Sequence, residues 1–145
     1  MGYTTKFKGE FEITPYPSKE LIEDINCFSS KRHDEKGYPG IWCQWIINSN
    51  GKLAWNGAEK FYYYVEWLQY LIREYFEVHG YKLNGKVNYQ GERMEDFGMI
   101  CIKENDIRQI CGRYDVSDNE LILSVTMDSN GKIEHEIKSF LMSEL

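Results

Sequence analysis

The run of four consecutive aromatic residues at positions 61–64 constrains the fold more than any other feature of this chain. It lies in a segment, residues 58–79, whose apolar residues recur at helical spacing, and Gly80 supplies the residue type that most often ends a helix. Consecutive residues of an α-helix point 100° apart, so one core cannot cover all four rings. The helix therefore packs between two layers, or some rings face solvent and form a binding surface.

The residues before this helix predict one strand, one shorter helix and a hairpin. Alternation over residues 3–13 indicates a half-buried strand with Gly9 as a bulge. Ser18 is suited to cap a helix that runs to about Ser30. A charged loop follows, and then come the predicted strands 41–47 and 52–55, which flank the hairpin signal Asn50-Gly51, where both turn residues are expected to take positive φ.

The residues after Gly80 predict a series of antiparallel strands. They cover residues 83–89, 99–102, 107–114, 121–127 and 132–137, with turns at Asn105-Asp106 and Asn130-Gly131. Strands in series with two helices predict an α+β fold, with the helices on one face of a mainly antiparallel sheet. The order up to about residue 90 is βαββαβ, which is ferredoxin-like, and C-terminal hairpins are added to it. The 145 residues fit a single domain.

The charge balance excludes some partners. The net charge is −6 and the isoelectric point about 5.1, which disfavours long nucleic acids and anionic membranes, since both attract Lys and Arg. The four cysteines show no metal-binding spacing, and no stretch approaches 18 apolar residues. We therefore expect a cytoplasmic protein with free thiols and with neither a metal nor a cofactor.

No catalytic motif occurs in the sequence. The three histidines show no metal-protease spacing, and no nucleophile elbow, phosphate loop or dinucleotide fingerprint is present. An enzyme of another type remains an alternative, with the carboxylates of the Glu92–Asp96 loop, or with Cys43 or Cys111 beside a histidine, as its reactive groups.

The aromatic residues and a few charged neighbours form the predicted ligand site. Rings stack on planar bases, cations hold phosphates, and a helix beginning near Asn56-Gly57, with Lys60 in its first turn, would add backbone donors. Solvated surface charge is the alternative for each single charged residue. The predicted ligand-binding residues are Trp42, Trp45, Trp55, Lys60, Tyr63, Tyr64, Glu92 and Arg93.

Several segments together resemble a family of small uncharacterised proteins of bacteria and their phages. The resemblance covers roughly residues 1–110 and rests on Trp42–Trp45, Glu59–Leu68, Leu83–Gly85, Tyr89–Glu92 and Asp96–Gly98. It implies a phage or mobile-element context and no particular chemistry.

These observations support two hypotheses of binding. In the first, the protein sequesters a small nucleotide-derived ligand, such as a host defence signal, by aromatic stacking and a few cations. In the second, it is an acidic inhibitor of a protein target, as in anti-defence or immunity proteins, because Tyr and Trp are frequent at interface hot spots. Exposed rings and a strand-rich edge are also compatible with a homo-oligomer.

Overall fold

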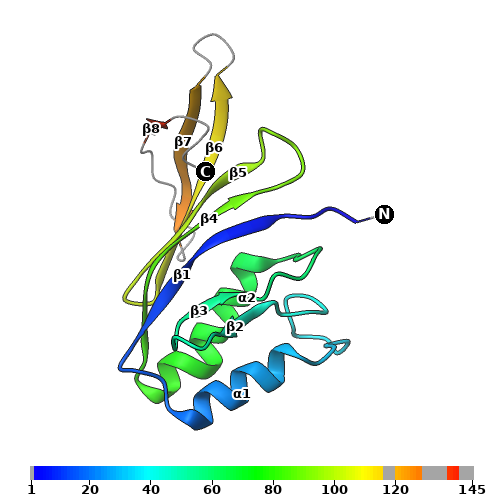
Figure 1. Cartoon of the computed structure of the whole chain (residues 1–145), viewed down its shortest axis with the longest axis vertical. Helices are drawn as coiled ribbons and strands as arrows, with labels where there is room; N and C mark the ends of the chain where they lie inside the picture. Colours follow the sequence, from blue (N-terminus) through cyan, green and yellow to red (C-terminus); the bar gives the residue numbers. More distant parts are fainter. Residues whose placement is uncertain (1, 116–119, 129–136, 141–145) are drawn as a thin grey trace.

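Two helical segments pack on one face of an antiparallel sheet (Figure 1). The computed structural model describes residues 2–115, 120–128 and 137–140, and it describes side chains up to residue 112. The α+β class, with a mainly antiparallel sheet and two helices, is therefore confirmed. In the described part of the chain, no helix has the length and apolar character needed to cross a membrane.

Within the described residues the sheet contains eight strands, and every neighbouring pair is antiparallel. Their order across the sheet is β2-β3-β1-β4-β5-β6-β7-β8, so β4 to β8 follow one another as a meander. This sheet has more strands than the predicted ferredoxin-like unit, and that finer order stays a prediction. The strands are β1 (Lys6–Thr14), β2 (Trp45–Ile47), β3 (Leu53–Trp55), β4 (Lys82–Gln90), β5 (Phe97–Lys103), β6 (Asp106–Asp115), β7 (Glu120–Asp128) and β8 (Ile137–Phe140). The predicted turn at 130–131 lies outside the described residues.

β1 pairs with β4 along its whole length. Their register runs without interruption from Lys6↔Gln90 to Thr14↔Lys82, so the bulge predicted at Gly9 is wrong. Gly9 instead has φ of 116°, and a Cβ there would lie 2.8 Å from the Lys86 carbonyl oxygen. Only glycine allows the two backbones to approach this closely.

The first helix is the predicted one, and it also covers the β2 edge of the sheet. Helix α1 (Lys19–Ser29) begins after Ser18, whose hydroxyl accepts a hydrogen bond from the Leu21 N–H at 3.1 Å. From its middle turn, Asn26 donates to the Ile47 carbonyl oxygen at 2.9 Å and accepts from the Ile47 N–H at 2.8 Å. One side-chain amide thus takes the place of a neighbouring strand at this edge.

The second helix begins six residues later than predicted. It comprises α2 (Tyr64–Leu71), a π-helical turn η1 (Ile72–Phe76) and a 3-10 turn η2 (Glu77–His79), and it ends at Gly80 as expected. The reason lies in tertiary contacts: the Trp55 indole N–H donates to the Ala58 carbonyl at 3.1 Å, and Gln44 Nε2 donates to the Glu59 carbonyl at 2.9 Å. These bonds hold the carbonyls that a helix starting at residue 58 would use.

The hairpin turns also differ in detail from the prediction. At residues 48–51 only Gly51, with φ of 74°, has positive φ, and Asn48 closes the loop by bonding with Lys52. The turn between β5 and β6 is the one with two left-handed residues, Glu104 and Asn105, one position earlier than predicted. The Asn105 carboxamide explains its conformation, since it bonds to the backbone of the neighbouring β4.

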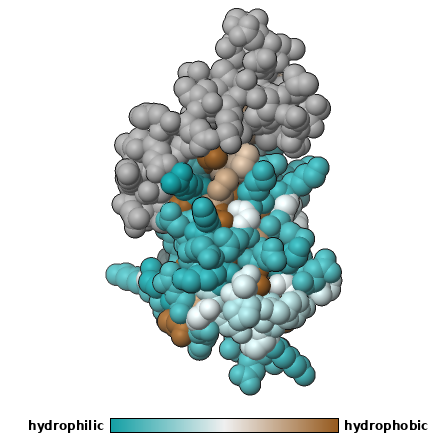
Figure 2. All heavy atoms as spheres, turned by 90° about the vertical axis from the view of Figure 1, so that its left-hand side faces the viewer, coloured by the Kyte–Doolittle hydropathy of each residue, from teal (hydrophilic) through white to brown (hydrophobic). Residues whose placement is uncertain are grey.

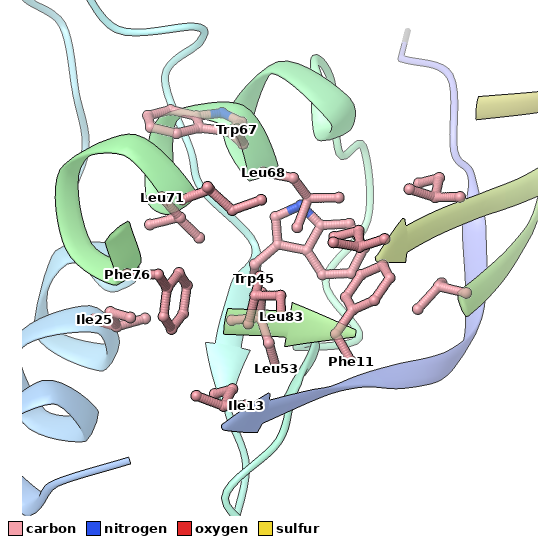
Figure 3. Packing of buried hydrophobic residues seen from close by; sticks show 14 of the residues in the cluster. Phe11, Ile13, Ile25, Trp45, Leu53, Trp67, Leu68, Leu71, Phe76 and Leu83 are labelled. Carbon is pink, nitrogen blue, oxygen red and sulfur yellow. The ribbon is translucent and has the colours of Figure 1, made fainter. Parts of the chain in front are cut away.

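The hydrophobic core lies between the sheet and the helices. Trp45, from the edge strand β2, lies beside Phe11 of β1 and Leu68 of α2 (Figure 3). All three side chains are fully buried. Burial of each side chain of this size stabilises the fold by about 1.5–3 kcal/mol.

Candidate functional site

The indole rings that were predicted to bind a ligand divide between the core and the surface. Trp45 has no exposed surface, and its indole N–H donates to the Tyr64 carbonyl at 2.9 Å. Trp55 is half-buried, and its N–H is shared between the Gln44 side chain and the Ala58 carbonyl, both at 3.1 Å. Trp42 is 46% exposed. Of these three rings, only Trp42 offers much of its surface to a partner in this conformation.

Four exposed apolar side chains lie on two segments that meet at Gly40, residues 41–42 and residues 62–63 before α2, and we call them the aromatic patch: Ile41, Trp42, Tyr62 and Tyr63. They are between 45% and 57% exposed. Gly40 joins the two segments that carry the patch, because a Cβ at Gly40 would lie 3.1 Å from the Tyr63 ring and 3.9 Å from the Tyr62 carbonyl. Both segments lie at the right-hand side of Figure 1.

The segment 60–63, which carries two rings of the patch, has left-handed backbone at both of its ends. Lys60 has φ of 62° and Tyr63 has φ of 60°, whereas Phe61 between them is 1% exposed. Non-glycine residues in this region cost of order 1 kcal/mol each and persist where surrounding contacts enforce them. Tyr63 is thus exposed from an irregular segment that directly precedes α2 and not from the face of a helix.

The chain's N-terminal segment connects Lys60 with the loop that contains Glu92 and Arg93. The Tyr3 N–H donates to the Tyr62 hydroxyl at 2.9 Å, and the Tyr3 hydroxyl donates to Asp96 at 2.6 Å. The Arg93 guanidinium lies 5.7 Å from the centre of the Tyr3 ring. The structure therefore brings Arg93 to Tyr3, while Glu92 stays exposed on the same loop.

Tyr64 belongs to a buried layer beneath this region. Its ring lies 4.9 Å from Phe7 and 5.6 Å from Tyr89. Burial raises the pKa of both Tyr64 and Tyr89 above that of an exposed phenol, and the charge of Asp96 adds to the shift at Tyr64. Both phenols are therefore neutral at physiological pH. The Tyr89 hydroxyl donates to Cys111 Sγ at 3.5 Å.

Sequence reasoning missed a second group of rings, which encloses Trp67. Phe28 stacks on His33 at 4.1 Å and on Tyr70 at 5.5 Å, and Tyr38 stacks on Trp67 at 6.2 Å. Burial, with Tyr38 nearby, raises the pKa of Tyr70 to about 12. The residues between α1 and β2 thus fold over α2, a contact for which the charged sequence of that loop gave no signal.

Two of the candidate reactive groups, Cys43 and Asp96, are held within the fold. Burial raises the pKa of the Cys43 thiol to about 11, so this group is protonated at neutral pH and is a poor nucleophile. Asp96 accepts the Tyr3 hydroxyl and so supports the loop. Among the described residues, no group of three potential ligands could hold a metal ion.

On the side away from the aromatic patch, the surface of the described residues is largely hydrophilic. Figure 2, which views the left-hand side of Figure 1, shows hydrophobic atoms only in small separate areas of the described surface. Comparisons of the chain with protein-family models, with curated proteins and with solved structures found no significant match, so the resemblance to bacterial and phage proteins stays a prediction.

Proposed function

We propose that this chain is a non-catalytic binding protein whose aromatic patch contacts a protein partner with a basic surface. The observation that carries the proposal is the exposure of Trp42, Tyr62 and Tyr63 on two segments that meet at Gly40. Large exposed apolar side chains that lie together mark interaction surfaces, and Trp and Tyr are the residues that contribute most at such surfaces.

Charge complementarity supports the basic character of the partner. The chain carries a net charge of −6, so its field attracts positively charged surfaces and repels polyanions. Electrostatic attraction of this kind accelerates association, while the rings of the patch supply most of the affinity once the partner covers them. Proteins that bind nucleic acids present such basic surfaces, and an acidic inhibitor could occupy one of them.

The test compares the patch with a matched exposed position. Wild type, Trp42→Ala, Tyr63→Ser and the control Val78→Ser are immobilised and exposed to a bacterial lysate at low and high salt. Val78 is 63% exposed and lies at the other end of the helical segment, so its loss leaves the patch intact. We expect one basic protein to be captured. The complex is then reconstituted from the two purified proteins, and each patch substitution should reduce its affinity about 30-fold. Equal capture by all four proteins would contradict the proposal.

Capture of a small nucleotide-like ligand is the second candidate, and the cation beside the rings favours it. The side chain of Lys60 packs against Gly2, next to the Tyr62 hydroxyl. A planar base stacked on an exposed ring would gain about 1–3 kcal/mol, and Lys60 could neutralise a phosphate. Titration calorimetry with cyclic nucleotides and ADP-ribose derivatives tests this candidate. If none of these compounds gives heat or changes the Trp fluorescence, this candidate is excluded.

The cellular context, the ferredoxin-like order and self-association are also part of the proposal. The resemblance supports a cytoplasmic phage or mobile-element protein that acts against a host defence. The strand order β2-β3-β1-β4, with a helix after β1 and another after β3, supports a ferredoxin-like unit that β5 to β8 extend. Light scattering of the purified protein decides whether the aromatic patch pairs with a second copy.

A further inference from the structure

The face of the sheet that points away from the helices contains a pocket of about 260 Å³. Lys6 and Lys8 of β1 line it together with Asn88 and Gln90 of β4, and Phe7 and Tyr89 complete the lining. The register places Lys6 opposite Gln90 and Lys8 opposite Asn88. Phe7 packs on Trp45 and Tyr64 in the core, so the alternating lysines face the other side.

The lysines of this pocket are available to an anion. Both are exposed, and in the described part of the chain neither forms an ion pair. Their Cα atoms are about 6.6 Å apart along one strand, so two flexible ammonium groups can converge on one phosphoryl group. The next acidic residue on this face, Glu10, is already held by Lys52 at 3.8 Å and by Asn48 at 2.7 Å.

Asn88 adds an acceptor that lacks a donor. Its Oδ1 atom is buried, and it has no hydrogen-bond partner among the described residues. A buried acceptor without a partner costs about 1–3 kcal/mol, and a ligand hydroxyl would remove that cost once the carboxamide turns its oxygen toward the pocket. Gln90 Nε2, in contrast, donates to the carbonyls of Gly91, Arg93 and Asp96 and therefore fixes the end of the pocket.

We propose that this pocket binds a small phosphorylated polyol, with the phosphoryl group between Lys6 and Lys8 and a hydroxyl donating to Asn88. Its volume is slightly below the usual range for ligand sites, so it suits a compact molecule such as a sugar phosphate. The site is separate from the aromatic patch, which lies on the helical side, and it would remain if the patch had no partner.

Titration calorimetry with ribose 5-phosphate, inorganic phosphate and ribose tests the proposal. We expect ribose 5-phosphate to bind most tightly and ribose not to bind. The double variant Lys6→Gln/Lys8→Gln should bind ribose 5-phosphate at least about tenfold more weakly. Lys86→Gln is the matched control, because Lys86 is exposed on the same face but does not line the pocket.

Asn88→Ala tests the hydroxyl contact separately. It should lower the affinity for ribose 5-phosphate to that for inorganic phosphate and leave the latter unchanged, a pattern that a merely structural role would not give. Circular dichroism of every variant confirms that the fold is retained. Absence of binding by both phosphorylated probes, or equal weakening by the Lys86→Gln control, would overturn the proposal.

Discussion

Replacing Asn26 with alanine should destabilise the protein through the sheet edge. The substitution removes two hydrogen bonds to Ile47, of 2.9 and 2.8 Å, and leaves a buried backbone N–H and carbonyl without them. At about 1–1.5 kcal/mol each, the loss is about 2–3 kcal/mol. Alanine is the better helix former and returns about 0.6 kcal/mol. The net loss is therefore about 1.5–2.5 kcal/mol, which corresponds to a decrease in Tm of roughly 5–10 °C.

Urea unfolding followed by Trp fluorescence measures this loss, since Trp45 is in the same edge strand. Glu23→Ala is the matched control: Glu23 is exposed on the same helix, and its pair with Lys19 at 4.0 Å contributes little. Asn26→Asp should fall between the two, because it keeps the acceptor and loses the donor. Light scattering should also detect association of the Ala variant through the unprotected strand. A loss for Asn26→Ala below about 0.5 kcal/mol would refute the edge-strand argument.

Three further predictions concern the helix cap, the meander and the buried thiol. Ser18→Ala removes the cap of α1 and should lower the unfolding free energy by about 1 kcal/mol in urea, whereas Ser18→Asp should preserve it. Gly98→Ala would place a methyl group on the Ile110 carbonyl oxygen and the Tyr89 hydroxyl, and a loss of about 2–3 kcal/mol is expected; an unchanged thermal midpoint would contradict this. Burial raises the pKa of Cys43 from 9.0 to about 11. The neutral thiol therefore makes its full contribution to the free energy of unfolding below pH 9, and this contribution disappears as the pH rises toward 11. Urea midpoints at pH 8 and above should therefore decrease more for wild type than for Cys43→Ala.

Local patterns were sufficient to predict elements whose determinants lie within them. The Ser18 cap and the spacing of Leu21 and Ile25 predicted α1, and the observed helix ends within one residue of the expected position. Alternation predicted that Val87 and Tyr89 of β4 would be buried on one face. In these cases the signal and the structure involve the same few residues.

The start of the second helix could not be predicted because distant side chains decide it. Residues 58–63 have helical periodicity, but Gln44 and Trp55 bind the carbonyls of Glu59 and Ala58. The predicted anion site at Asn56-Gly57 therefore does not exist in that form, since no helix begins there. An α-helix begins only at Tyr64, after the left-handed Tyr63.

The candidate sites depended on strand pairing, which a single sequence does not contain. Lys6 and Lys8 alternate with core residues, and so do Asn88 and Gln90, but the paired residues Lys8 and Asn88 are 80 positions apart in the sequence. Their convergence follows from the register of β1 with β4. The aromatic surplus left open whether the rings are enclosed between layers or reach the surface, and the structure shows both: Trp42, Tyr62 and Tyr63 are exposed, whereas Trp45 is buried.

The meander from β4 to β8 implies an order of events during folding. Each of its hairpins joins strands that are adjacent in the sequence, so these pairs can form quickly and with little loss of chain entropy. The central pairing of β1 with β4 closes a loop that contains both helices and the β2–β3 hairpin, and so it is the slow, non-local step. Substitutions in β1 should therefore slow folding, whereas those far along the meander should mainly accelerate unfolding.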